Sequence, residues 1–250
     1  MRRIQNNFRN HSNWMSYYKH KYFNKGTDFT FKCRSGLMIK VPARLMHTYK
    51  ECFFDETYLK GFPGTSMASP IKTIIDIGAN VGYFSLSMLS LYPESSVFAY
   101  EPIPVNFNQL SKYKSENPNL NFNVTNAAVT KLGIESISLN YDDSDTFTTS
   151  ASIFDDNKQK NQLIVKATSL DKILDDNQLE TIDLLKLDCE GSEYDILYNC
   201  TDEIIDRISM MAIETHQGTG ENENTQSMAD FIKKHNFQVK VDGDIIWAWK

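Results

Sequence analysis

The segment "IIDIGANVGYFSL", Ile74 to Leu86, decides the fold of this chain. An apolar run ends beside an acid, and a Gly-x-Asn-x-Gly turn leads into a second apolar-patterned segment. Gly78 and Gly82 allow positive φ and leave the backbone open to a ligand, and Asn80 tolerates left-handed geometry better than most residues do. Because an ordinary connection between a strand and a helix does not need this freedom, we expect a ligand to bind against the turn.

Strands and helices alternate on both sides of this turn. The expected strands span residues 72–77, 97–100, 122–124, 182–188, 208–214, 237–241 and 245–249, and the expected helices span 82–91, 104–117, 169–176, 190–200 and 224–235. Strands that alternate with helices form parallel sheets with crossover helices. The sequence therefore predicts an α/β fold with a mostly parallel sheet and helices on both faces.

Two regions depart from this pattern. Residues 134–141 and 162–169 resemble strands that flank a long polar loop, 142–160, and loops of this length are uncommon unless they serve a function. Residues 1–70 are basic and aromatic and predict a small α+β extension. Within it we expect a hairpin over 29–42, a helix over 54–62 and a boundary of turn-forming residues at 63–70. The expected domains are the extension, 1–70, and the main domain, 71–250.

Composition indicates a globular protein. Hydrophobic residues make up 41% of the 250 residues and charged residues 23%. No apolar run approaches the roughly 18 residues of a membrane span, and the N-terminal residues lack the apolar core of a secretory signal. The four cysteines form no Cys-x-x-Cys pair and have no zinc-ligand spacing. We therefore expect free thiols and a cytoplasmic location.

The net charge of −6 is unevenly distributed. Residues 1–50 hold eleven Lys/Arg and one acid, Asp28, for a net charge of +10, and the other 200 residues hold 15 basic and 31 acidic residues, for −16. Such asymmetry often indicates an anionic partner. The alternative is that the basic arm docks on the acidic body of its own chain or of a partner subunit.

Two acids predict the ligand at the turn. The spacing around Gly78 is neither the G-x-G-x-x-G of dinucleotide sites nor a P-loop. Asp76 would repel a pyrophosphate and suits a cationic ligand, while Glu101, at the end of the next strand, can accept from ribose hydroxyls. A cation joined to a ribose describes S-adenosylmethionine.

The sequence from Ile71 to Gln217 resembles the FkbM family of S-adenosylmethionine-dependent methyltransferases. The resemblance rests on "IIDIGANVGYFSL", "FAYEPIPVNFNQL", "NVTNAAV", "TSLDKIL", "IDLLKLDCEGSEYDIL" and "MAIETH". It implies a class I, Rossmann-like methyltransferase fold with a seven-stranded sheet. It also implies O-methylation, often of sugars or of natural products that carry them.

The resemblance also implies a set of site residues. The expected cofactor-binding residues are Asp76, Gly78, Ala79, Asn80, Gly82, Phe84, Glu101, Pro102, Asn106, Asn126, Ala127 and Asp188. The expected catalytic residues, which include candidates for the base that removes a hydroxyl proton, are Asp188, Glu190, Glu214 and His216. The spacing of the oxygen and nitrogen donors in this second set requires no metal, so no metal is predicted.

Three functions are compatible with these residues. The segment "LDCEGSE" after the fourth parallel strand lacks the Asn/Asp-Pro-Pro-Tyr loop of many N-methyltransferases, which favours an oxygen acceptor, most simply a sugar hydroxyl of a glycan or glycosylated metabolite. An RNA methyltransferase that uses the basic arm is a less favoured alternative. The third is a non-catalytic module for assembly or for a membrane surface. The sequence leaves the acceptor and homo-oligomer formation open.

Overall fold

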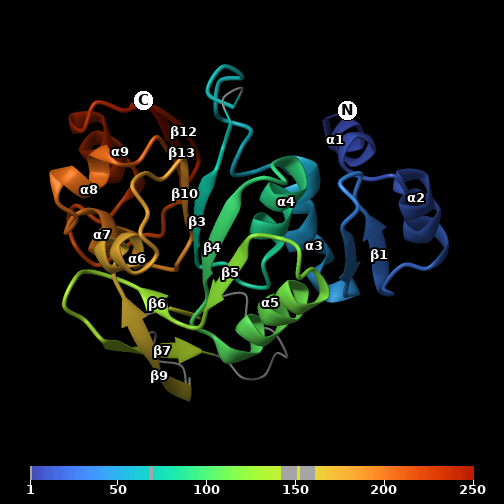
Figure 1. The fold of residues 1–250 in the computed structure, drawn as a ribbon, viewed down its shortest axis with the longest axis horizontal. Coiled ribbons are helices and arrows are strands. Elements are labelled where there is room, and N and C mark those ends of the chain that lie inside the picture. Colours follow the sequence, from blue (N-terminus) through green and yellow to red (C-terminus); the bar gives the residue numbers. More distant parts are fainter. Residues whose placement is uncertain (1, 68–69, 142–150, 153–160) are drawn as a thin grey trace.

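A seven-stranded sheet forms the centre of the protein (Figure 1). The computed structural model describes residues 2–67, 70–141, 151–152 and 161–250. The strands of this sheet are β3 (Thr73–Ile77), β4 (Ser96–Tyr100), β5 (Phe122–Thr125), β10 (Leu184–Leu187), β11 (Met210–Glu214), β12 (Gln238–Asp242) and β13 (Ile245–Trp249). Their order is β12-β13-β11-β10-β3-β4-β5, and β13 is antiparallel to both its neighbours while the pairs from β11 to β5 are parallel. The predicted fold class is confirmed.

Helices cover both faces of the sheet (Figure 1). One face carries α4 (Tyr83–Leu91) and α5 (Pro104–Glu116), and the other carries α6 (Leu170–Asp176), α7 (Glu193–Leu197), α8 (Asp202–Asp206) and α9 (Thr225–Lys234). Successive strand residues point to opposite faces. Ile74 accordingly packs in the core on the α4 side, whereas Ile75 and Ile77 pack in the core on the α6 side.

The carboxyl ends of β3, β4, β10 and β11 meet at one edge of the sheet. In a parallel sheet this edge is the usual place for a ligand, because the loops that leave the strands gather there. Register places Ile77 beside Tyr100 on one side and beside Leu187 on the other. Residues that follow these strands, far apart in the sequence, are thereby brought to one site.

A second, smaller sheet lies beside β5. It consists of β6 (Ala128–Val129), β7 (Ser136–Tyr141), β8 (Ala151–Ser152) and β9 (Asn161–Thr168), in the order β6-β9-β7-β8. The antiparallel pair β7 and β9 confirms the two strands expected over 134–141 and 162–169. Most of the loop expected over 142–160 lies outside the described residues.

The N-terminal segment packs on the α4 side of the sheet. Its elements are α1 (Arg2–Asn10), α2 (Trp14–Phe23), β1 (Phe29–Lys32), β2 (Met38–Val41), the 3-10 turn η1 (Ala43–Leu45), α3 (Met46–Lys50) and the π-helical turn η2 (Glu51–Asp55). The expected hairpin is confirmed, and Gly36 has a φ of +98° at its turn. The helix expected over 54–62 is wrong, because Glu56 takes a left-handed φ of +50° and ends the helical path.

The basic arm binds acids of its own chain. Arg3 lies 2.7 Å from Asp55, and both Arg2 and Arg9 pair with Glu56. Such pairs at the surface contribute little stability individually. They do agree with the interpretation in which the arm docks on the acidic body of its own chain.

One further expected element is shorter in the structure. The helix expected over 190–200 begins only at Glu193, because Glu190 and Gly191 have φ values of +53° and +112° that no α-helix contains. These two residues instead form a turn at the carboxyl end of β10. Within the part of the chain that the structure describes, no helix has the length and apolarity to cross a membrane.

Candidate functional site

The glycine turn has the backbone that the sequence predicts. The φ angles of Gly78, Asn80 and Gly82 are +71°, +51° and +90°. A Cβ on Gly78 would lie 1.8 Å from the carbonyl oxygen of Asp188, and one on Gly82 would lie 2.4 Å from Leu110 of α5. Both glycines are therefore already required by packing within the protein.

Glu101 braces the turn from the end of β4. Its carboxylate is buried and accepts hydrogen bonds from the backbone N–H groups of Asn80 (2.8 Å) and Ile103 (2.9 Å). Burial raises the pKa of this carboxyl group to about 7, although these two hydrogen bonds act in the opposite direction. The Asn106 side chain also hydrogen-bonds to this carboxyl group, and a carboxylate has about four acceptor sites, so it can still accept a hydrogen bond from a ligand hydroxyl. Asn126 donates to the carbonyl oxygens of Glu101 (2.8 Å) and Pro102 (3.0 Å), which fixes the backbone after β4.

A hollow of about 620 Å³, part of it open to solvent, lies in front of the turn. We call it the first hollow. Predicted cofactor-binding residues that line it are Gly78, Asn80, Glu101, Pro102, Asn106, Ala127 and Asp188. Apolar side chains of Ile103, Val129 and Leu139 complete its wall. A nucleoside fits this lining, because an apolar wall suits a base and a carboxylate suits ribose hydroxyls. The other predicted cofactor-binding residues, Asp76, Ala79, Gly82, Phe84 and Asn126, do not border this hollow.

Asp76 lies behind the turn and is paired with a lysine. Its side chain is fully buried, accepts from the Ser85 hydroxyl (2.6 Å) and lies 3.3 Å from Nζ of Lys186. The Lys186 ammonium also donates to the carbonyl oxygen of Gly78 (2.7 Å). From the sequence, we expect the charge of Asp76 to face a cationic ligand. In the structure Lys186 neutralises that charge, so Asp76 supports the turn from behind.

A second hollow, of about 990 Å³, adjoins the first. Gly78, Asn80, Asp188 and Glu190 line both hollows. The second is also lined by predicted residues of the main domain, namely Ala79, Phe84 and Glu214, and by residues of the N-terminal segment, namely Arg44, His47, Thr48, Glu51, Cys52 and Tyr58. The N-terminal segment thus forms one wall of the site.

Tyr58 connects two of the predicted catalytic carboxylates. Its hydroxyl oxygen is 2.8 Å from Oδ2 of Asp188 and 2.8 Å from Oε2 of Glu214. A tyrosine hydroxyl has one proton to donate, so one of the two carboxyl groups must carry a proton for both contacts to be hydrogen bonds. Burial and the charge of Asp188 raise the pKa of Glu214, so its carboxyl group holds a proton more readily than an ordinary glutamate does.

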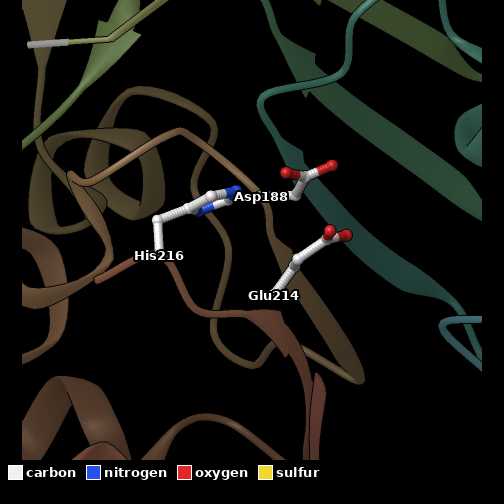
Figure 2. Close-up of side chains that lie close together, drawn as sticks. All are labelled: Asp188, Glu214 and His216. Atoms are coloured by element: carbon white, nitrogen blue, oxygen red, sulfur yellow. The ribbon is translucent and has the colours of Figure 1, made fainter. Parts of the chain in front are cut away.

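His216 faces the same place from the loop after β11 (Figure 2). Its Nδ1 is 2.9 Å from Glu193, a fully buried carboxylate, and its Nε2 is 3.6 Å from Glu190. Burial opposes protonation, but Glu193 and Glu190 outweigh it and raise the pKa of His216 to about 9. At neutral pH the ring is therefore cationic. An isolated histidine titrates near neutrality, and the buried Glu193 is the main group that raises the pKa of this one.

The predicted catalytic residues Asp188, Glu214 and His216 converge in Figure 2. One nitrogen or oxygen atom from each lies within 4.8 Å of the others, but a protonated His216 has no lone pair for a metal ion and is itself a cation beside the two carboxyl groups. Lys186 already lies 3.4 Å from Asp188, and Tyr58 already contacts both carboxylates. The ammonium of Lys186 therefore offsets part of the negative charge of these carboxylates, and Tyr58 hydrogen-bonds to both.

Residues 76–239, more than half of the chain, match the methyltransferase FkbM domain. The chain belongs to the FkbM methyltransferase family. It is accordingly a methyltransferase that uses S-adenosylmethionine, and the first hollow provides groups that fit the nucleoside part of this cofactor.

Individual relatives are distant. The 31-O-demethyl-FK506 methyltransferase FkbM of Streptomyces tacrolimicus is 24% identical over 229 residues, which cover 80% of this chain and 84% of that protein. The AMB antimetabolite synthetase AmbE of Pseudomonas aeruginosa is 23% identical over 234 residues, and the match covers 80% of this chain but only 11% of AmbE. The crystal structure of methyltransferase FkbM from Methylobacillus flagellatus KT aligns over 83% of this chain and 54% of that one, with a TM-score of 0.50 and 14% identity. That likeness concerns the fold alone.

Two residues of the site were missed in the sequence. Lys186 is a cation inside the apolar strand "IDLLKLD", and this position is a signal, because lysine is almost never buried unless it is paired. Tyr58 gave no such signal. It lies 130 residues from Asp188 in the chain, within a stretch that is rich in aromatic residues.

Proposed function

We propose that this methyltransferase transfers the methyl group to a hydroxyl oxygen of a sugar, on a glycan or a glycosylated metabolite. The observation that carries the proposal is the position of the carboxylates of Asp188, Glu190 and Glu214 where the two hollows adjoin. A hydroxyl acceptor must lose its proton during transfer, and carboxylates can accept it. The name of one relative, the 31-O-demethyl-FK506 methyltransferase of Streptomyces tacrolimicus, describes methylation of an oxygen, which supports an oxygen acceptor here.

The cofactor would occupy the first hollow. Glu101 would accept from the ribose hydroxyls, the apolar wall with Ala127 would hold the adenine, and the backbone of Gly78 and Asn80 would border the methionine part. S-adenosylmethionine supplies a methyl group that its sulfonium sulfur has already activated. The protein's own contribution is therefore alignment of the acceptor and removal of a proton.

The acceptor would enter the second hollow. Its lining combines hydroxyl, carboxylate, imidazole and guanidinium groups from the N-terminal segment with the carboxylates of Asp188 and Glu214. Such a polar wall suits a polyhydroxylated molecule. We infer that the acceptor hydroxyl donates to Asp188, which takes up its proton during transfer, and that Lys186 and the Tyr58 hydroxyl hold this carboxylate in position.

Two substitutions test these assignments. Asp188→Asn should lower kcat by about two to four orders of magnitude, the typical contribution of a general base, and cofactor affinity measured by calorimetry should change much less. Tyr58→Phe should lower kcat less and alter its pH profile, because the connection to Glu214 is lost. The acceptor would be sought among fractionated cell glycans and RNA with a labelled methyl donor.

Two results would count against the proposal. Labelling of RNA with no labelling of glycans or glycosylated metabolites would replace the acceptor class. A full kcat in Asp188→Asn would exclude this carboxylate as the base. Glu203→Gln is a matched control, because it removes an exposed acid at the start of α8, outside both hollows.

A further inference from the structure

Helix α1 buries asparagines and exposes two apolar residues among its arginines. Asn6 and Asn10 are buried and donate to the carbonyl oxygens of Phe54 and Phe53, both at 2.8 Å. On the outside, Ile4 and Phe8, one helical turn apart, are 54% and 53% exposed. A surface helix normally has the opposite arrangement.

Helix α2 also exposes apolar side chains. Met15, Tyr22 and Phe23 are 61%, 82% and 76% exposed. The ring of Phe8 on α1 contacts the ring of Trp14, the first residue of α2, edge to face at 5.6 Å. The two helices therefore meet where Phe8 contacts Trp14, at the end of the molecule opposite α8 and α9 (Figure 1).

A cationic hollow lies beside these residues. It has a volume of about 880 Å³, and Lys21, Lys25, Lys50 and His20 are in its lining, with no acid among them. Among the residues that the structure describes, none of the three lysines forms an ion pair. Burial, Lys21 and Arg3 together lower the pKa of the half-buried Lys50. The charged side chains that line this hollow are thus all basic, although Asp55 nearby offsets part of the charge of Lys50.

We propose that α1, α2 and this hollow form a docking surface for a membrane that contains anionic phospholipid. Phosphate headgroups would neutralise the three lysines. Tyr22 and Phe23 lie between two of them in the chain, and aromatic rings of this kind lodge at the boundary of headgroups and acyl chains. Ile4 and Met15 favour lipid over RNA, since aliphatic side chains bury in acyl chains but do not stack on bases as aromatic rings do.

The test is co-sedimentation of the full chain with vesicles. Binding is expected to vesicles in which about a third of the lipid is phosphatidylglycerol and not to pure phosphatidylcholine. The triple variant Lys21→Gln, Lys25→Gln, Lys50→Gln should bind on the order of a hundredfold more weakly. Each lysine near an anionic surface contributes about 1 kcal/mol to binding, and about 1.4 kcal/mol corresponds to a factor of ten. Tyr22→Ser with Phe23→Ser should also weaken binding although the charge is unchanged, which simple attraction to a polyanion would not produce.

A matched control removes three lysines elsewhere. Lys233→Gln, Lys234→Gln and Lys240→Gln change the net charge equally on α9 and β12 and should leave vesicle binding unchanged. Circular dichroism would verify that every variant is folded. No binding to anionic vesicles, or equal losses in the control, would overturn the proposal. The same holds if a single-stranded RNA oligonucleotide binds through Lys21, Lys25 and Lys50 and the vesicles do not.

Discussion

Replacing Lys186 by methionine should destabilise the protein far more than the loss of an ordinary lysine. The side chains of Lys186 and Asp76 are 3% and 0% exposed, and their charged atoms are 3.3 Å apart. Removal of one partner leaves a buried, uncompensated carboxylate, which typically costs about 3–5 kcal/mol. In a chain of this size the loss corresponds to a fall in Tm of roughly 6–20 °C.

Urea unfolding followed by circular dichroism measures this loss. The double variant Asp76→Asn, Lys186→Met should recover most of it, because no buried charge is then left without a partner. Lys112→Met is the control, since the pair Lys112–Glu116 is about half exposed on a helix surface and should contribute no more than about 0.5 kcal/mol. If Lys186→Met costs no more than the control, or if the double variant is no more stable than the single one, the reasoning from burial is refuted.

Two other predictions concern the same turn. Because burial raises the pKa of Glu101 from 4.5 to about 7 in the folded state, its contribution to stability is fully present below pH 4.5 and declines as the pH rises through about 7, by roughly 3 kcal/mol. Glu101→Gln should abolish this part of the pH dependence in urea titrations, and an unchanged slope would contradict the assignment. Gly78→Ala should abolish cofactor binding in calorimetry, since a Cβ would lie 1.8 Å from the Asp188 carbonyl oxygen. Gly133→Ala is its control, with positive φ and open space around the Cβ.

The fold was largely predictable because apolar runs and turn residues determine it locally. Gly78, Asn80 and Gly82 were predictable as left-handed positions from residue type alone, and the structure confirms all three. The helix expected over 54–62 failed for the complementary reason. Its residues permit a helix, but the left-handed Glu56, whose carboxylate pairs with Arg9 from α1, ends it, and that contact spans 47 residues.

The site was predictable where it depends on strand ends and not where it depends on tertiary contacts. The positions of Glu101, Asp188 and Glu214 follow from the ends of β4, β10 and β11 in a parallel sheet. The protonation of His216 does not follow from sequence, because it depends on Glu193, which is fully buried in the structure.

The ammonium of Lys186, on the neighbouring strand β10, donates a hydrogen bond to the carbonyl oxygen of Gly78. The turn is therefore not a self-contained module. A protein engineer who grafts residues 74–86 onto another sheet would carry along a carboxylate without its counter-ion and a loop without its anchor. The smallest transplantable unit is therefore the three strands β3, β4 and β10, with Lys186 and Glu101 included.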